Sequence, residues 1–308
     1  MPCGAVSLKT WGAVLRVRVC DGGGTMRVVS GEENLRVYNE PAVAAHYGAL
    51  DYLTVCELLL FEKYIPRGAA ILDLGVGGGR TTPYLSGIAS RYLGLDYSEE
   101  MIRTCRRKFP ELEFQVADAS DLSRLDDSCF GAVVFAFNGL DYVIPDARRK
   151  RCLRECFRIL KPNGVLIFSS HNPRAILVRP GWSRERLHEF AHRLAGEAGA
   201  NVAARLLTPI KSLHAWARAA LASATRVGSR LHTAAFWRGE GYALDRSHGG
   251  LLTHYWVPRC AVDELRQTGF RRLACMGDDY PRTSHMFTTD WYYYVFSKDD
   301  IVGETSCA

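Results

Sequence analysis

Short apolar runs alternate with amphipathic segments through the middle of the chain. The apolar runs predict strands at 69–74, 92–95, 113–116, 132–137 and 165–169. Segments with apolar positions at helical spacing predict helices at 83–89, 99–108 and 148–160. Strands and helices in this order are typical of a parallel sheet with helices on both faces. The pattern therefore predicts an α/β domain.

The pattern extends in both directions from this region. Residues 43–64 have apolar positions at helical spacing before the stop signal Pro66-Arg67-Gly68, which predicts one helix ahead of the first strand. Toward the carboxyl end, we expect a helix at 257–268 and strands at 272–276 and 291–296. The predicted fold class is a doubly wound, mostly parallel sheet of seven strands, the last of them antiparallel.

The alternation is interrupted after His171, and this divides the chain. We expect a loose leader at 1–30, the α/β domain at 31–173 and 251–300, and a helical cap at 174–250, inserted after the fifth strand. The leader is predicted to be loose because Arg16 and Arg18 interrupt its only apolar run, an order that also excludes a signal peptide.

Composition places the chain among ordinary globular proteins. Of its 308 residues, 47% are hydrophobic and 23% are charged, which excludes disordered and collagen-like classes. The apolar stretches are shorter than the ~18 residues that a membrane-spanning helix needs. Ten cysteines are scattered along the chain, and Cys152 and Cys156 lack a second ligand pair at zinc spacing. We therefore expect a cytoplasmic protein with reduced thiols and no bound metal.

Positive charge is concentrated in the insertion. Between Arg174 and Arg238 there are eleven basic and three acidic residues, a local net charge of +8, whereas the rest of the chain carries −2. Thr208-Pro209 predicts the start of an amphipathic helix, whose basic face carries Lys211, Arg218, Arg226 and Arg230. Such a helix could contact an anionic membrane surface, or it could be a cap whose charges are solvated.

A glycine-rich loop follows the first predicted strand, in the segment Asp73-Leu74-Gly75-Val76-Gly77-Gly78-Gly79. Glycines at alternate positions let the backbone turn sharply and approach a ligand closely. A dinucleotide fingerprint would need its third glycine at position 80, where Arg80 stands. This spacing disfavours a nicotinamide-dependent reductase.

The loop resembles the first motif of the class I S-adenosylmethionine-dependent methyltransferases. Four further segments resemble the family's later motifs and follow in the family's order: 94–98, 115–119, 133–142 and 154–166. The resemblance implies the class I fold and S-adenosylmethionine as cofactor. It also implies the cofactor-binding residues, which are Tyr47, Asp73, Gly75, Gly77, Gly79, Asp96, Tyr97, Met101, Asp118, Ala119 and Asn138.

Within this set, the resemblance implies particular roles. Asp96 would hold the ribose, because two carboxylate oxygens can accept hydrogen bonds from both hydroxyls. Asp118 and Ala119 would contact the adenine, and Asn138 lies in the loop that lines the methionine part. Family members often carry histidine near position 141, where this chain has Asp141, so the role of that histidine does not transfer.

Methyl transfer needs alignment more than a base, because the sulfonium is already an activated leaving group. A base becomes useful when the acceptor is a hydroxyl or an ammonium that must lose a proton. His171 is the first candidate, because it leaves the fifth strand at the carboxyl edge of the sheet, where ligands bind in this architecture. His254 and Asp141 are the further candidates, and each of the three could instead be a structural residue.

These features predict O- or N-methylation of a small molecule. The charge of the insertion suggests an anionic acceptor, such as a phosphorylated sugar, a lipid-linked intermediate or an acidic natural product. The alternatives are a non-catalytic protein of the same fold that binds the cofactor, and a transfer RNA or other nucleic-acid methyltransferase. The nucleic-acid alternative is less favoured, because no aromatic platform for an extruded base is evident.

Overall fold

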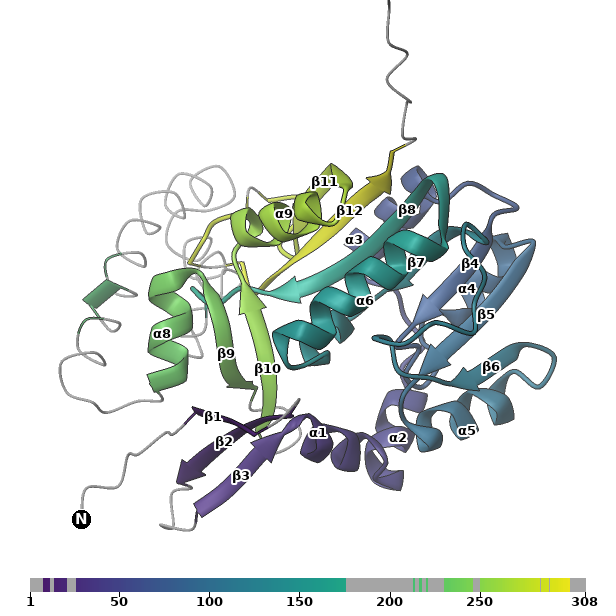
Figure 1. Ribbon diagram of the computed structural model, residues 1–308. Coiled ribbons are helices and arrows are strands. Elements are labelled where there is room, and N and C mark those ends of the chain that lie inside the picture. The colour runs from purple at the N-terminus through teal and green to yellow at the C-terminus, as the bar shows by residue number, and fades with distance from the viewer. Residues whose placement is uncertain are drawn as a thin grey trace, which may run out of the picture.

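The computed structural model describes residues 8–11, 14–20, 26–175, 213, 216–217, 220, 230–245, 250–282, 284–287 and 289–299. At its centre is a seven-stranded sheet with the order β11-β12-β8-β7-β4-β5-β6 (Figure 1). Its strands are β4 (Ala70–Leu74), β5 (Arg91–Asp96), β6 (Glu113–Val116), β7 (Phe130–Phe135), β8 (Leu160–His171), β11 (Phe270–Gly277) and β12 (Trp291–Lys298). Only β12 runs antiparallel to its neighbours in this sheet, which confirms the predicted fold class.

Helices cover both faces of this sheet, as the alternating pattern predicted. They are α3 (Val55–Tyr64), α4 (Thr82–Ile88), α5 (Glu99–Lys108), α6 (Asp146–Ile159) and α9 (Pro258–Gln267). Adjacent residues of β7 enter different cores, because side chains alternate across a strand. Val133 packs in the core under α6 and α9, whereas Val134 packs in the core under α3, α4 and α5.

The amino-terminal region differs from the predicted loose leader. It forms an antiparallel sheet of β1 (Leu8–Trp11), β2 (Val14–Cys20) and β3 (Met26–Ser30). In the sequence, Arg16 and Arg18 alternate with Val17 and Val19, a two-residue period that is typical of a strand and not of an interrupted apolar run.

The single helix predicted at 43–64 was also wrong. The chain forms α1 (Gly31–Tyr38), α2 (Pro41–Gly48) and, after a break, α3. A capping box starts α3: Thr54 Oγ1 accepts a hydrogen bond from the Glu57 backbone NH at 3.2 Å, and Glu57 Oε2 accepts one from the Thr54 NH at 2.9 Å. These bonds satisfy amide groups that are free at the start of a helix, and they therefore stabilise a separate helix that begins at Val55.

The described part of the insertion is only partly helical. It contains α8 (Arg230–Arg238) and β9 (Glu240–Asp245), and β9 pairs antiparallel with β10 (Leu251–Trp256) in a separate two-stranded sheet. Gly239 ends α8 with a φ of +81°, a conformation that favours glycine. The predicted helix start at Thr208-Pro209 lies outside the described residues, as do the side chains of Lys211, Arg218, Arg226 and Arg230.

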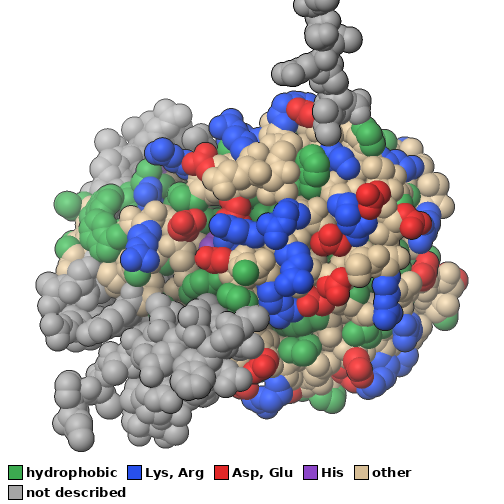
Figure 2. Space-filling model, in the orientation of Figure 1, with side chains coloured by type: hydrophobic (Ala, Val, Ile, Leu, Met, Phe, Trp, Pro, Cys, Tyr) green, Lys and Arg blue, Asp and Glu red, His purple; other side chains and the backbone are tan. Residues whose placement is uncertain are grey.

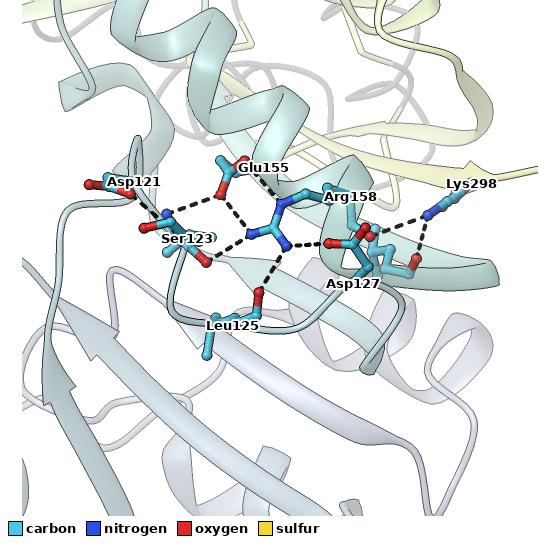
Figure 3. Close-up of polar contacts among 9 residues, drawn as sticks. Asp121, Ser123, Leu125, Asp127, Glu155, Arg158 and Lys298 are labelled. Carbon is cyan, nitrogen blue, oxygen red and sulfur yellow. Dashed lines mark hydrogen bonds and ion pairs between the residues drawn. The ribbon is translucent and has the colours of Figure 1, made fainter.

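Arg158, near the end of α6, fixes the connection between β6 and β7 (Figure 3). Its guanidinium donates to Glu155 Oε2 at 2.8 Å and to Asp127 Oδ1 at 2.6 Å. It also donates to the carbonyl oxygens of Leu122 and Leu125, both at 2.8 Å. The loop that leaves β6 is therefore tied to a helix of the core.

Two further observations concern membranes and metals. Among the helices that the structure describes, none is long and apolar enough to cross a membrane. Within the same residues, no group of three or more His, Cys, Asp or Glu side chains is placed to hold a metal ion.

Candidate active site

A cavity of about 470 Å³ opens at the carboxyl edge of the sheet, beyond the ends of β4, β5, β6 and β7. Its volume is in the range of about 300–1,000 Å³ that is usual for small-molecule sites. Its wall combines the glycine loop, the ends of β5 and β6, the loop after β7 and the helices α1 and α2. This edge is where open α/β sheets bind ligands.

The glycine loop is packed too closely for side chains. Gly75 and Gly77 have φ values of +66° and +55°, which favour glycine. A Cβ on Gly75 would lie 2.4 Å from the ring of Phe135, and one on Gly78 would lie 2.4 Å from the backbone of Gly48 at the end of α2. The second contact brings α2 against the loop, so that Tyr47 joins the cavity wall.

Asp96, at the end of β5, lines the cavity. Its Oδ2 accepts a hydrogen bond from the Gly77 NH at 2.9 Å, and its Oδ1 accepts one from the Ser98 NH at 2.9 Å. Burial raises the pKa of this carboxyl to about 6, against the opposing effect of these bonds. A backbone hydrogen bond from Tyr97 also favours the charged form of this carboxyl.

The wall beyond Asp96 is mainly apolar and includes Tyr97, Met101 and Ala119, all predicted from sequence. Asp118 is also in the wall, but its Oδ2 forms an ion pair with Arg148 at the start of α6. Its Oδ1 accepts hydrogen bonds from the Ser120 NH and hydroxyl, both at 2.9 Å. Sequence reasoning did not anticipate Arg148, because their contact spans 30 positions of the chain.

Three predicted cofactor residues lie behind the cavity wall. Asp73 Oδ2 accepts hydrogen bonds from the Thr81 hydroxyl at 2.6 Å and the Tyr92 hydroxyl at 2.9 Å, so this buried side chain braces the loop. A Cβ on Gly79 would meet the ring of Phe109 at 2.7 Å, which places Gly79 against α5 and its end. Asn138 is buried beside His171 and does not line the cavity either.

Four tyrosines meet at one side of the cavity: Tyr38, Tyr47, Tyr97 and Tyr142. The ring centroid of Tyr38 lies 5.9 Å from Tyr47, 6.0 Å from Tyr97 and 5.6 Å from Tyr142. The Tyr142 hydroxyl donates to Asp245 Oδ2 of β9 at 2.8 Å, which joins the insertion to the cavity wall. The site assigned from sequence included Tyr47 and Tyr97 but missed the other two.

Arg80, which argued against a dinucleotide fingerprint, lies in the cavity wall with a buried partner. Its guanidinium donates to both carboxylate oxygens of Glu57, at 2.6 and 2.7 Å, and its Cζ lies 4.6 Å from the ring centroid of Phe137. The charge of Arg80 is therefore neutralised on the side away from the cavity. Neither the pair nor Phe137 was identified from sequence.

His171 and Asp141, two of the three predicted catalytic candidates, are in contact. His171 Nδ1 lies 2.8 Å from Asp141 Oδ2, and the same oxygen accepts a hydrogen bond from the His171 backbone NH at 2.8 Å. The Nδ2 of Asn138 lies 3.1 Å from His171 Nε2. Asp141 is fully buried, and burial raises the pKa of its carboxyl despite the hydrogen bonds from His171 and Ser170.

The third candidate, His254, is a core residue of β10. Its ring lies 5.1 Å from the ring of Trp256 and 5.5 Å from that of Tyr242, and only 2% of the residue is exposed. Burial lowers its pKa well below the ordinary value, and the Arg149 charge lowers it further. None of the three candidates lines the cavity: His254 is enclosed in the core, whereas the His171 side chain is 19% exposed and lies behind the loop of Asn138 and Gly139. Burial of His254 disfavours its role as a base.

The strand order, the glycine loop and the acid at the end of the second strand define the class I S-adenosylmethionine-dependent methyltransferase domain, which binds that cofactor. Residues 72–168 match the family model described as a methyltransferase domain. The chain therefore contains a domain of this class.

Comparison with known proteins gives more distant similarities. The chain is 30% identical over 135 residues to the tRNA (carboxymethyluridine(34)-5-O)-methyltransferase of Arabidopsis thaliana. This match covers 44% of the present chain and 31% of the relative. It is 26% identical over 205 residues to a probable S-adenosylmethionine-dependent methyltransferase of Mycolicibacterium smegmatis, covering 64% of this chain and 66% of the relative. The chain thus spans less than two thirds of either relative.

A solved structure shares the fold over most of the chain. It is the 1,6-didemethyltoxoflavin-N1-methyltransferase of Burkholderia thailandensis with bound 1,6-didemethyltoxoflavin and S-adenosylhomocysteine. The TM-score is 0.53 at 13% sequence identity, and the match covers 92% of this chain and 96% of that chain.

Proposed function

We propose that this protein transfers the methyl group of S-adenosylmethionine to an oxygen or nitrogen atom of a small molecule. The observation that carries the proposal is the position of Asp96, which lines the cavity and holds the glycine loop through a hydrogen bond from the Gly77 NH to Oδ2. The two carboxylate oxygens of Asp96 suit the two ribose hydroxyls. The buried Tyr97 hydroxyl, which has no hydrogen-bond partner among the described residues, offers a further polar contact.

The remaining wall also suits this cofactor. Met101 and Val116 provide apolar surface for a flat base, and the open backbone of the glycine loop can approach the methionine part. When bound, the cofactor supplies a methyl group on a positively charged sulfur, which is an activated leaving group. The protein then has to align the acceptor and exclude water.

His171 is the proposed base. If its Nδ1–H donates to Asp141 Oδ2, its Nε2 has the lone pair that can take a proton from an acceptor hydroxyl or ammonium. Asp141 holds the ring in this tautomer and stabilises the imidazolium that forms. Asn138 Nδ2 bonds Nε2 in the present arrangement, so the acceptor has to replace this contact.

The acceptor is proposed to be an anionic small molecule. The support is the net charge of +8 between Arg174 and Arg238, which would attract an anion at long range. Transfer RNA is the second candidate acceptor, supported by the 30% identical relative that acts on tRNA. Both candidates are anions, so a comparison of the two is needed to separate them.

Two measurements test the proposed function. Calorimetric titration should show binding of S-adenosylmethionine and S-adenosylhomocysteine, and tighter binding of NADH would overturn the assignment. Transfer of a labelled methyl group is then measured with a panel of sugar phosphates, lipid-linked sugars and acidic metabolites, and in parallel with unmodified tRNA. Cofactor binding without transfer to any acceptor would favour the non-catalytic alternative, and transfer to tRNA alone would replace the small-molecule proposal.

A further inference from the structure

Trp216 and Trp237 are exposed side by side at α8; Leu213 lies three residues before Trp216 in the chain, and Met286 directly precedes Phe287, whose ring contacts Trp216. We call these four exposed side chains the apolar patch. Leu213 is 71% exposed, Trp216 41%, Trp237 45% and Met286 45%. The rings of Trp216 and Trp237 have centroids 4.9 Å apart. Contiguous exposed apolar surface of this kind marks an interaction site more often than single exposed residues do.

Buried aromatic side chains support this patch from below. Phe236 and Phe287 are buried, and their stacked rings have centroids 6.0 Å apart. Trp216 packs edge-on against both rings, at 5.5 Å from Phe236 and 5.6 Å from Phe287. Both exposed tryptophans therefore pack on this buried aromatic pair.

The apolar patch adjoins the edge of the sheet that carries His171. Asn172, the next residue, donates from Nδ2 to the carbonyl oxygen of Met286 at 2.7 Å and to that of Thr289 at 2.9 Å. The loop that carries Met286 is thereby held beside the end of β8. The backbone of one patch residue is thereby tied to the residue that follows the proposed base.

Basic residues accompany the patch. Arg238 follows Trp237 at the end of α8, and Arg174 Nη1 lies 3.3 Å from Met286 Sδ. Both belong to the segment between Arg174 and Arg238 with a net charge of +8. Figure 2 shows basic side chains next to hydrophobic ones at the left of the molecule, in the region where Figure 1 places α8.

We propose that the apolar patch docks this protein on the surface of an anionic lipid bilayer. Tryptophan is suited to the membrane interface, because its ring is apolar while its NH can bond to water or headgroups. Neighbouring lysines and arginines are attracted to anionic headgroups. A nucleic acid would use the charges but would leave Leu213 and Met286 without a role, so a lipid surface accounts for more of the patch.

Docking through the apolar patch would bring the loop that is bonded to Asn172 to the membrane surface. If the proposed function holds, the acceptor is then a lipid-linked molecule, and its anionic head reaches the cavity while its chain stays in the bilayer. This second statement rests on the proposed methyl transfer, whereas bilayer binding does not.

Co-sedimentation of the full chain with vesicles tests the docking. The wild type should sediment with phosphatidylcholine vesicles that contain phosphatidylserine, and less so with phosphatidylcholine alone or at high salt. Trp216→Ser combined with Trp237→Ser should lower the partition about tenfold or more. The matched control is Val55→Ser with Leu58→Ser, which removes two exposed apolar side chains from α3 and should sediment like the wild type.

Several outcomes would overturn the proposal. They are a wild type that ignores anionic vesicles, a patch variant that sediments like the wild type, and a control that loses binding equally. Loss of tRNA binding by the patch variant with no change in vesicle binding would assign the patch to nucleic acid instead. Circular dichroism verifies that the variants fold, and cofactor titration of each variant separates a failure of docking from a failure of the proposed function.

Discussion

His171 and Asp141 meet through a single carboxylate oxygen, which accepts hydrogen bonds from both the backbone NH and the ring Nδ1 of the histidine at 2.8 Å. The ring and its backbone are therefore fixed together at the end of β8. Asp141, in the loop after β7, thus supports a histidine on the neighbouring strand.

Removing the imidazole should slow the reaction and leave cofactor binding unchanged. His171→Ala is expected to lower kcat by about 10²–10⁴-fold for a hydroxyl or ammonium acceptor, which is the usual cost of losing a general base. Asp141→Asn should cause a smaller loss of kcat, because an amide can hold the ring in the wrong tautomer. Steady-state rates with calorimetry of the cofactor test this, and full activity of His171→Ala would exclude the role.

Asp96→Ala should weaken binding of S-adenosylmethionine by about 1.5–3 kcal/mol, the usual range for hydrogen bonds to a charged group. The loss has two sources, because the carboxylate faces the cavity and also holds the Gly77 NH of the glycine loop. Isothermal titration measures it. Asp121→Ala is the control, because it removes an exposed carboxylate from the loop after β6 and should bind the cofactor normally. Equal cofactor affinities of the two variants would count against Asp96 as the ribose site.

The buried Asp73 should make stability depend on pH in an unusual direction. Burial raises the pKa of its carboxyl from 3.8 to about 6, so folding favours the protonated form. This contribution to stability is complete below the unfolded pKa and is lost as the pH rises through about 6.

Comparison with Asp73→Asn isolates this effect, because Asp96 and all other groups are shared by both proteins. From pH 4 to pH 7 the wild type should lose about 2 kcal/mol of its free energy of unfolding relative to Asp73→Asn, because only the wild type has to ionise a buried carboxyl. Urea unfolding at several pH values measures the difference. Parallel stability curves would show that Asp73 keeps its ordinary pKa in the fold.

The buried pair of Glu57 and Arg80 should be strongly coupled. Glu57→Gln leaves the Arg80 guanidinium buried without a counter-charge and is expected to lower the free energy of unfolding by about 3–5 kcal/mol. Replacing both, with Glu57→Gln and Arg80→Met, should cost less than the sum of the single changes, because no unpaired charge remains. Glu33→Gln, in an exposed pair with Arg36, is the control and should cost about 1 kcal/mol or less. Additive effects in the buried pair would contradict the coupling.

The sequence by itself determined the sheet, its glycine loop and the acids at the strand ends. These features are visible because they are local: apolar runs alternate with helical periods, Asp96 is the last residue of β5, and Asp118 lies two residues beyond β6. The separate three-stranded sheet could also be read locally, since Val17 and Val19 alternate with arginines. That alternation was misinterpreted as an interrupted apolar run.

Only the tertiary structure decided which of these residues face the cavity. Asp73 is the penultimate residue of β4 and pairs with Gly94, whereas Asp96 is the last residue of β5, two positions further toward the cavity. Asp73 therefore binds Thr81 and Tyr92 inside the fold, while Asp96 lines the cavity. The contact of His171 with Asp141, like that of Arg80 with Glu57, joins residues from separate elements. Periodicity contains no information about such long-range pairs, so the candidate base and its partner could be proposed singly from sequence but assembled only by the fold.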